Sequence, residues 1–342
     1  MATFKQKLGC WLHERWRTEF VLLFPDVAFR LGMRWLNLCN RHEHLLKEND
    51  EVSRICDWQD SSFLTVARFF PRVGGKLLKH CFNEWPIRLL QQPESLTLSH
   101  HPKISVILPV GGSEYTLLFQ CVLAAFFGQT CKNMEVIVVE HSDSPAYETL
   151  CPEGVKYMFI SQKDDRQFNK ALAINIGVLK SSAPYILIHD ADIVPPGTYV
   201  ESVLQRLNEG WDAVRAMRFL FCLEREDTEK FMRGNGAYLP KRVPLVMQNF
   251  PGASTAVHKD TYFRIGGHDE DFLGWGGEDL EFYDRLKTVR LFPGSYSPGI
   301  HLWHTASEKK ISGDRNNRLL TEKRKLPPQP RIEILHKQRT VK

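Results

Sequence analysis

The chain has 342 residues, of which 43% are hydrophobic and 25% are charged, and it includes 21 Phe, 9 Tyr and 8 Trp. These apolar side chains are numerous enough to close a core, which excludes extensive disorder and indicates one large globular domain or two smaller ones. The longest apolar runs, such as residues 20–24 and 124–127, are far shorter than the roughly 18–20 residues that span a bilayer, which excludes an integral membrane protein.

No apolar block of the kind found in secretion signals lies near the N-terminus, because polar and charged residues interrupt the sequence at 13–15. We therefore expect a cytoplasmic protein. The eight cysteines are scattered and form no Cys-x-x-Cys pair, so we expect reduced, mostly buried thiols rather than a zinc site.

Charge is unevenly distributed along the chain. The formal net charge is +5, whereas residues 308–342 alone hold 11 Lys or Arg against 4 Asp or Glu. Such a basic segment can contact anionic lipid or a phosphorylated ligand, but it is more often a solvated terminus. Prolines at 327, 328 and 330 argue against a long terminal helix. We therefore interpret 308–342 as a basic C-terminal tail and expect no nucleic-acid partner.

Residues 1–100 have the pattern of a helical N-terminal extension. Apolar residues recur at helical spacing with Lys and Arg between them, at Phe4, Leu8, Trp11, Leu12 and Trp16. Such a stripe packs on a neighbouring domain more often than it lies on a membrane surface, and the sequence leaves peripheral contact with the inner face of a membrane open. A polar linker at 91–102 ends the extension.

Residues 101–307 alternate between short apolar runs and helical patterns. The runs at 104–110, 134–140, 155–160 and 185–189 predict buried strands, and the segments 117–127 and 168–179 predict helices between them. Strands that alternate with helices predict an α/β fold, an open twisted sheet with helices on both faces.

Two aspartates follow the strand at 185–189. Asp190 and Asp192 would lie at the carboxyl end of that strand, where open α/β sheets bind ligands. Carboxylates this close repel one another unless a cation or hydrogen-bond donors neutralise them, which a divalent ion bound to oxygen ligands does. Two solvated turn aspartates are the simpler alternative.

A glycine-rich loop at 274–277 runs into a helix that begins with acidic residues. Acidic side chains in a first turn often only cap the helix. Trp275 makes that interpretation less satisfactory, because a large aromatic side chain in a glycine loop suggests stacking on a sugar or a base. Glu278 and Asp279 beside it are candidates for a general base.

Two histidines lie near the end of the same region. His301 and His304 follow a turn-rich segment, and in a bend both imidazoles can converge on one ion. A metal ligand and a satisfied polar residue are equally plausible roles for each of them.

Taken in order, six blocks resemble glycosyltransferases of the GT-A fold, of the family-2 type with a galactosyltransferase-like C-terminal half. That half is shared by β-1,4-galactosyltransferases, polypeptide N-acetylgalactosaminyltransferases and bacterial chondroitin polymerases. The resemblance covers residues 103–307 and implies a Rossmann-like mixed sheet. Its blocks are residues 104–110, 168–177, 190–195, 250–254, 274–282 and 301–304.

The resemblance implies a metal site and a catalytic carboxylate. Asp192 corresponds to the metal ligand, normally for Mn²⁺ and alternatively for Mg²⁺, with Asp190, His301 and His304 completing the site. Asp279 corresponds to the catalytic base and Glu278 to its neighbour. The residues that the resemblance assigns to substrate are Pro109, Glu140, His141, Phe168, Lys170, Asn175, Asp190, Asn249, Gly252, Trp275 and Gly277.

Departures from the family pattern affect donor recognition. Lys170 stands where the galactosyltransferases usually have Arg, so a point charge replaces a bidentate contact. Glu140 and His141 replace the paired aspartates that commonly lie beside uracil. Asn249 stands near a bulky Tyr of the galactosyltransferases, which suggests room for a 2-acetamido group, although Asn249 can equally be a loop residue without donor contact.

The function implied is a metal-dependent, inverting glycosyltransferase. It would move a hexose or N-acetylhexosamine from a UDP-sugar to a glycan or lipid-linked glycan acceptor in the synthesis of a bacterial polysaccharide, lipopolysaccharide or capsule. Two alternatives remain. A sugar-phosphate nucleotidyltransferase would need cations around a glycine loop after the first strand, and residues 111–114 lack them. A non-catalytic sugar-binding module would not need the carboxylates that are present here.

Overall fold

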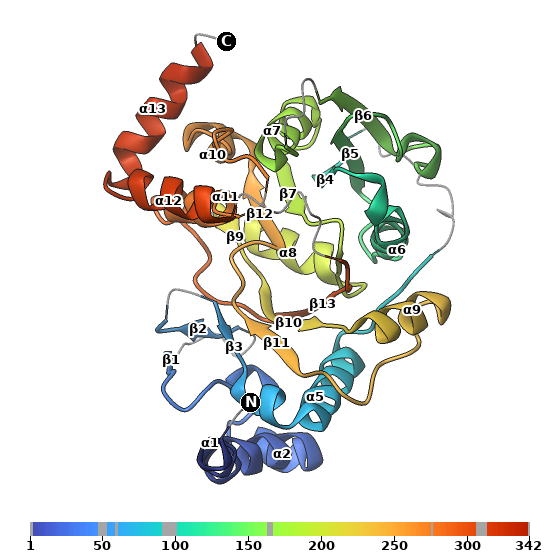
Figure 1. Cartoon of the computed structure of the whole chain (residues 1–342), viewed down its shortest axis with the longest axis vertical. Helices are drawn as coiled ribbons and strands as arrows, with labels where there is room; N and C mark the ends of the chain where they lie inside the picture. The colour runs from blue at the N-terminus through green and yellow to red at the C-terminus, as the bar shows by residue number, and fades with distance from the viewer. Residues whose placement is uncertain are drawn as a thin grey trace.

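The computed structural model describes residues 3–46, 53–58, 61–90, 101–162, 167–274, 276–305 and 313–340. It contains two stacked sheets, with helices around the upper one and the N-terminal helices at the opposite end (Figure 1). The main sheet has six strands in the order β6-β5-β4-β7-β12-β9. Its strands are β4 (Ile104–Val110), β5 (Met134–Ser142), β6 (Lys156–Ser161), β7 (Tyr185–His189), β9 (Ala213–Val214) and β12 (Ser254–His258).

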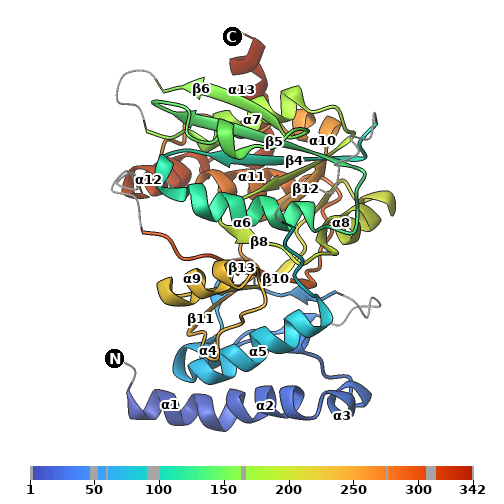
Figure 2. The same cartoon turned by 90° about the vertical axis from the view of Figure 1, so that its right-hand side faces the viewer.

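Strands β4 to β7 are parallel and β12 is antiparallel to β7, so the sheet is mixed. Successive side chains of β4 enter different cores: Val106 and Leu108 join one apolar cluster and Ile107 the other. The predicted α/β fold, with an open mixed sheet, is confirmed. Helices α6 and α7 lie on opposite faces of the sheet (Figure 2). The helices around this sheet are α6 (Thr116–Phe127), α7 (Lys170–Lys180), α8 (Tyr199–Asn208), α10 (Lys259–Arg264) and α11 (Glu278–Leu286).

A second sheet of five strands, in the order β3-β11-β10-β13-β8, lies beneath the main one. Strands β10 and β13 are parallel neighbours in this sheet. Strand β8, which follows the turn after β7, pairs with β13, so the end of β13 lies beside that turn. Its strands and adjacent helices are β3 (Ser62–Phe63), β8 (Ile193–Val194), β10 (Met217–Cys222), β11 (Leu245–Gln248), β13 (Ser297–His301), α4 (Thr65–Phe69), α5 (Pro71–Glu84) and α9 (Arg225–Arg233).

The N-terminal extension is largely helical but not wholly so. Strand β3 pairs with β11, so the extension contributes an edge strand to the second sheet. Strands of two residues are too short to show alternation, which is why the sequence pattern did not reveal them. Its other elements are α1 (Phe4–Cys10), a π turn (Trp11–Arg15), α2 (Trp16–Leu23), α3 (Pro25–Arg30), a 3₁₀ turn (Trp35–Asn37), β1 (Leu45–Leu46) and β2 (Ile55–Cys56).

The buried guanidinium of Arg218 fixes this extension to the second sheet. It donates to the carbonyls of Leu36 and Leu38, at 3.3 and 2.6 Å, and to Gln248 on the neighbouring strand. A buried charged group needs all of these partners, so the extension is an integral part of the fold.

The expectation of a C-terminal tail without a long helix is wrong. Helices α12 (Gly313–Lys323) and α13 (Pro328–Thr340) pack on α11, and Pro328 and Pro330 lie in the first turn of α13, where a missing N–H breaks no helical hydrogen bond. Arg331 pairs with the buried Glu281 at 3.1 Å. The basic residues are therefore used in part to bind this segment to α11.

Among the described residues, no helix is both long and apolar enough to cross a membrane. All eight cysteines are free, three of them buried and five half-buried, so fewer thiols are fully buried than expected.

Candidate active site

The acidic turn at residues 190–192 joins the two sheets. Strand β7 of the main sheet ends at His189, and β8 of the second sheet begins at Ile193. The carboxyl ends of β4 and β5 lie alongside, because these strands are parallel neighbours. Asp190 and Asp192 therefore lie at the edge where open α/β sheets bind ligands.

The shape of this turn depends on His189, which the sequence reasoning missed. Its Nε2 donates to the carbonyl of Ile193 at 2.9 Å, and its Nδ1 accepts from the Ser254 hydroxyl at 2.9 Å. Burial lowers the pKa of His189 to about 4, so the imidazole is neutral and can make both bonds. A buried histidine at a strand end carries no sequence signal that distinguishes it from any other.

Asp192 and the two predicted histidines form one cluster. The pairing of β13 with β8 sets His301 opposite Ile193, and the backbone N–H of Leu302 donates to the carbonyl of Asp192 at 2.9 Å. Asp192 Oδ2 then lies 3.1 Å from His304 Nε2 and 3.6 Å from His301 Nε2. One ligand atom from each of the three residues lies within 4.8 Å of the others.

This donor set fits a divalent transition ion. Burial would raise the pKa of Asp192, but the hydrogen bond from His304 and the charges of both imidazoles lower it well below its usual range. When the His304 ring is neutral, with its proton on Nδ1 and donated to the carbonyl of Thr305 at 3.1 Å, Nε2 offers a lone pair to a metal instead of a hydrogen bond to Asp192. One carboxylate and two imidazoles suit Mn²⁺ better than Mg²⁺. Asp190 is not part of this cluster.

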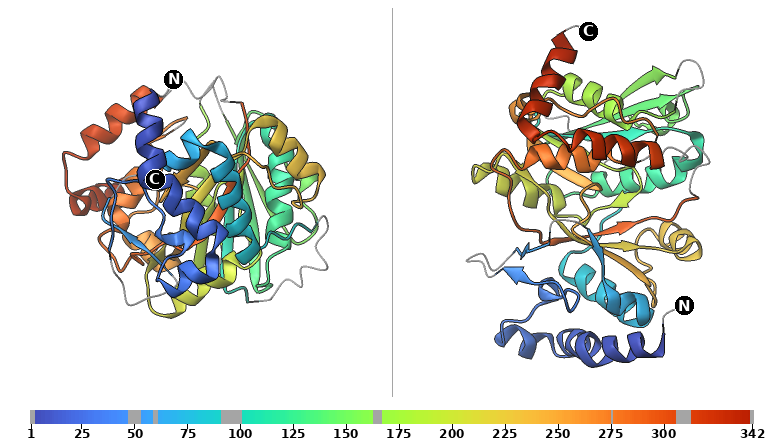
Figure 3. Two further views of the ribbon diagram at one scale, coloured as in Figure 1. Left: turned by 90° about the horizontal axis from the view of Figure 1, so that it is seen from below. Right: turned by 60° about the vertical axis from the view of Figure 1, so that its left-hand side comes forward.

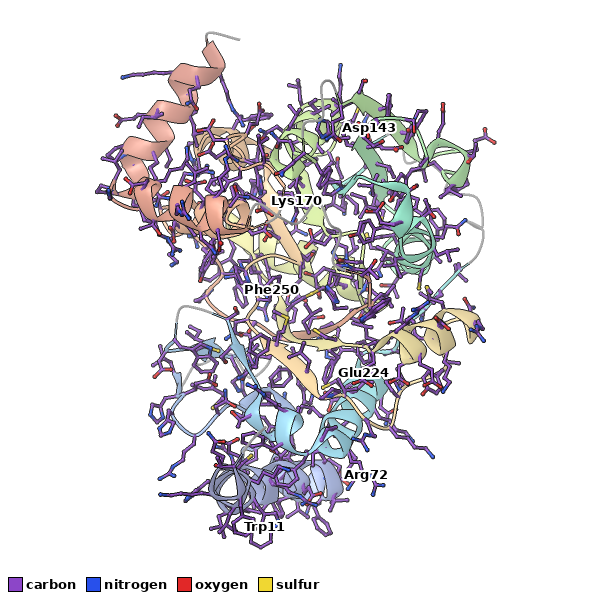
Figure 4. The ribbon with its side chains drawn as sticks, in the orientation of Figure 1. Trp11, Arg72, Asp143, Lys170, Glu224 and Phe250 are labelled. Atoms are coloured by element: carbon purple, nitrogen blue, oxygen red, sulfur yellow. The ribbon has the colours of Figure 1, made fainter. Side chains whose placement is uncertain are left out.

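A second cluster forms where three carboxylates meet the ammonium of Lys170. Its Nζ lies 2.7 Å from Asp190 Oδ1, 3.1 Å from Asp279 Oδ2 and 3.6 Å from Glu278 Oε1. The residues come from the end of β7 and from the starts of α7 and α11. Figure 4 labels Lys170 near the centre of the upper half of the molecule. The aspartate turn and the candidate base thus share one counter-ion.

Helix starts hold these side chains in place. Asn169 caps α7 by accepting from the N–H of Leu172 at 2.9 Å, which makes the lysine the first helical residue. Gly277 precedes α11 with φ +93°, a conformation that favours glycine, so that the helix begins directly at Glu278 and Asp279. The positive end of the helix stabilises their negative charges.

The second cluster holds more negative than positive charge, and the pKa values reflect this. Burial and, after it, the neighbouring charge of Asp279 raise the pKa of Glu278 to about 7 against the smaller opposing effect of Lys170. Burial likewise raises the pKa of Asp190 to about 6 against the opposing effect of Lys170. Glu278 Oε2 is buried without a hydrogen-bond partner. Such a group is typical of a site built to receive a cation or a donor.

The loop before β12 supports both aspartates of this cluster. The backbone N–H of Ala253, at φ +62°, donates to Asp190 Oδ2 at 3.2 Å. A Cβ on Gly252 would lie 2.5 Å from Asp279 Oδ2, so glycine is required for the loop to approach the carboxylate. These residues line a small hollow of about 10 Å³, enough for roughly one water molecule.

Comparison with known proteins identifies the family of this chain. A family model described as "Glycosyltransferase like family 2" matches residues 105–315, more than half of the chain. The chain belongs to this family. The matched segment includes the main sheet, both clusters and the start of α12, whereas the N-terminal extension lies outside it. The predicted family is therefore confirmed.

Several curated proteins are similar to this glycosyltransferase family-2 chain. Validoxylamine A glucosyltransferase from Streptomyces hygroscopicus subsp. limoneus is 26% identical over 237 residues, which cover 59% of this chain and 51% of the relative. Human β-1,4-galactosyltransferase 7 is 28% identical over 178 residues, 48% of this chain and 47% of the relative. Human β-1,4-galactosyltransferase 4 is 23% identical over 178 residues, 49% and 42%. The chain thus spans about half the length of the curated relatives it matches.

In this family-2 chain Phe168 is the predicted aromatic contact to the donor that lies within the described residues. The backbone N–H of Gly274 donates to the carbonyl of Phe168 at 2.8 Å, which ties the glycine loop to the start of α7. The Phe168 ring lies 6.1 Å from His141, whose Nδ1 accepts from the N–H of Asn169. These residues lie together at the carboxyl ends of β4 and β5. Trp275 lies outside the described residues.

Two predicted donor contacts are buried within the main sheet. Pro109 lies within β4. Glu140 accepts hydrogen bonds from the backbone of residues 146–147 and from the Tyr157 hydroxyl at 2.6 Å. The carboxylate of Glu140 therefore holds the loop after β5, and any contact with a base would compete with these bonds.

Two predicted amides are also engaged elsewhere. The Asn175 side chain bonds to the carbonyl of His268 at 2.9 Å on the outer side of α7. Asn249 accepts from Ser295 at 3.1 Å and donates to Cys56 Sγ at 2.8 Å, so its amide faces the N-terminal extension. To bond a 2-acetamido group, Asn249 would have to leave these partners.

Arg215 is a further residue without a sequence signal. Its guanidinium lies 3.9 Å from the centre of the Tyr283 ring, and it donates to the carbonyl of Asn249 at 3.0 Å. Burial lowers the pKa of this guanidinium, and the negative charge of Asp279 opposes that shift. Arg215 therefore places a second cation behind the candidate base.

Proposed function

We propose that this chain transfers a hexose or N-acetylhexosamine from a UDP-sugar to a hydroxyl of a glycan acceptor, with inversion at the anomeric carbon. The observation that carries the proposal is the position of Asp190. It lies two residues from Asp192 in the metal-ligand cluster, and its carboxylate shares Lys170 with the candidate base Asp279. The family model and the named relatives support glycosyl transfer as the reaction class.

Asp192, His301 and His304 would hold Mn²⁺, as their nitrogen and oxygen donors fit that ion. When bound, the ion would supply positive charge to the departing diphosphate, where negative charge develops. Burial lowers the pKa of Lys170, but the surrounding carboxylates raise it well above its usual value. The ammonium therefore stays charged and can pair with a phosphate of the donor.

Asp279 is the proposed base. Its side chain is 23% exposed, so an acceptor hydroxyl can reach it, and the ammonium of Lys170 lies 3.1 Å from its Oδ2. Removal of the proton as the acceptor oxygen attacks fits direct displacement with inversion. Glu278 has a pKa of about 7 and is half-protonated near neutrality, so it can donate a hydrogen bond to a sugar hydroxyl.

The acceptor we propose is a bacterial surface glycan, free or lipid-linked, in polysaccharide, lipopolysaccharide or capsule synthesis. Its support is the sequence resemblance to bacterial chondroitin polymerases. Asn249 makes UDP-N-acetylhexosamines the first donors to test, although the present contacts of its amide give this choice no support.

The test is a transfer and hydrolysis assay with UDP-galactose, UDP-glucose and both UDP-N-acetylhexosamines, with and without Mn²⁺. We expect turnover of at least one donor that requires the ion, and an inverted product by NMR. Asp279→Asn should lower turnover by about 10²-fold or more, whereas Asp284→Asn, on the same helix but bonded to Arg324, should not.

Other outcomes would contradict the proposal. Formation of a UDP-sugar from UTP and a sugar phosphate would identify a nucleotidyltransferase. Donor binding without turnover across a broad acceptor panel would identify a binding module. Full activity of Asp279→Asn would remove the proposed base.

A further inference from the structure

The helices at the N-terminal end of the molecule expose a large apolar face. Phe4 is 81% exposed, Trp16 60% and Trp11 50%, which are high values for side chains that gain free energy on burial. We call this the outer N-terminal face. Its residues are Phe4, Leu8, Trp11, Leu12, Trp16, Leu23, Phe24, Val27, Phe29 and Leu31.

The same helices already use their other side for packing. Cys10, Thr18 and Val21 are buried, and α1 and α2 pack with them against α4 and α5. A surface helix that buries one face normally presents polar residues on the other. Here the side turned away from the protein is apolar as well, so packing within the chain does not account for it.

The π turn at Trp11–Arg15 keeps the outer N-terminal face continuous. In a regular α-helix, residues four apart advance by about 40° around the axis, so the series Phe4, Leu8, Leu12 and Trp16 would drift off one side. A π turn winds more slowly per residue and cancels this drift within the series. The π turn therefore keeps these exposed apolar residues aligned on one side of the helix.

The face lies at one end of the molecule and is accessible. Helices α1, α2 and α3 follow one another in a row beneath the second sheet (Figure 2), and they extend across the end of the molecule when seen from below (Figure 3). Trp11 is at the outermost edge of that end (Figure 4). No described helix can cross a membrane, so a lipid contact here would be parallel to the surface.

Charge around the face is predominantly positive. In residues 3–34 and 65–84 the exposed acidic side chains are only Asp26 and Glu84. Exposed tryptophans beside basic residues are typical of helices that lie in a membrane interface, with lysines at the level of anionic headgroups. The exposed basic residues of these two segments are Lys5, Lys7, Arg30, Arg68, Arg72, Lys76 and Lys79.

We propose that the outer N-terminal face binds the surface of an anionic membrane, with its apolar side chains inserted among the lipid headgroups and the basic residues around it paired with phosphates. The family model does not reach this region, and the inference does not depend on the transfer reaction. It places the catalytic half beside a membrane.

The experiment is co-sedimentation of the full chain with vesicles of phosphatidylcholine, with and without phosphatidylglycerol. We expect binding that requires phosphatidylglycerol and weakens as salt rises, because salt screens the headgroup charge. The double variant Trp11→Gln/Trp16→Gln should bind at least about tenfold more weakly. Leu179→Gln, which changes a residue 63% exposed on α7, is the matched control and should bind like wild type.

A second variant tests the charges without touching the apolar residues. Lys5→Glu/Lys7→Glu should also lose binding, whereas Lys180→Glu on α7 should not. Absence of binding by wild type, equal binding to neutral vesicles, or unchanged binding of both double variants would overturn the proposal. The proposal would also be overturned if the wild-type chain were a dimer that fails to bind vesicles and the Trp11→Gln/Trp16→Gln variant were a monomer. A second copy of the chain would then cover the face.

Discussion

Lys170 Nζ lies 2.7 Å from Asp190 Oδ1, although the two residues come from different elements of the main sheet and its helices. The same nitrogen contacts Asp279 at 3.1 Å, so one ammonium connects the aspartate turn to the candidate base. Two partly buried carboxylates tolerate this proximity because a permanent positive charge lies between them.

Replacement of Lys170 should therefore destabilise the protein. Lys170→Gln leaves the surrounding carboxylates without a counter-ion, and we expect a loss of about 2–4 kcal/mol in the free energy of unfolding at pH 8. Lys170→Arg keeps the charge and should lose much less. Urea denaturation measures both. Equal stability of Lys170→Gln and wild type would show that the ammonium is not needed to balance this cluster.

Because of Glu278, the free energy of unfolding should fall as pH rises. Its pKa in the folded protein is about 7, above the ordinary value of 4.5, so between these values the folded state retains a proton that the unfolded state has released. The stability that this proton contributes is complete below about pH 4.5 and is lost as pH rises through 7.

Glu278→Gln removes this dependence and should be more stable than wild type at pH 8, by up to about 3 kcal/mol, but not at pH 4.5. Urea unfolding at the two pH values measures the difference. Glu333→Gln, which changes an exposed carboxylate, is the control. A variant less stable than wild type at pH 8 would mean that the carboxylate is ionised and well paired there.

The histidine pair should determine metal affinity. His304→Ala and His301→Ala each remove one of three ligand candidates, and we expect Mn²⁺ binding to weaken by about tenfold or more in each. His336→Ala, on the exposed side of α13, provides a matched control. Titration calorimetry without donor measures the affinity directly, and unchanged dissociation constants in both variants would place the ion elsewhere.

Gly252 should be sensitive to a single methyl group. A Cβ at this position would lie 2.5 Å from Asp279 Oδ2 and push the carboxylate away from its present place. We expect Gly252→Ala to lower kcat by about tenfold to 10²-fold with a smaller change in donor KM. Gly9→Ala, where a Cβ meets nothing within 4 Å, is the control. Full turnover of Gly252→Ala would show that the position of Asp279 is not critical.

The local pattern was sufficient to predict the four parallel strands, the acidic turn, the acidic helix start and two imidazoles able to converge on one ion, whereas the site that joins them to Asp192 was implied by the family resemblance. Each of these depends on a local pattern: an apolar run, a glycine before a helix, or two imidazoles beyond a turn. The family resemblance supplied the roles of these residues, because the motifs occur in the order that the family shows.

Other features depended on partners that are distant in the sequence. Strand β3 has two residues and exists because β11 lies beside it, and the helices of the basic C-terminal segment form where α11 offers acidic partners. His189 and Arg215 carry no pattern, since their importance comes from what surrounds them after folding.

The amino-acid pattern alone thus determined strands β4 to β7, helices α6 and α7, and the types of ligand atom that the chain offers, because periodicity and capping act over a few residues. Only the tertiary structure decided that Lys170 is shared by carboxylates up to 109 residues away, and that the apolar stripe at the N-terminus faces away from the protein. Both depend on how separate elements pack, which is set by the free energy of the whole fold rather than by neighbouring residues.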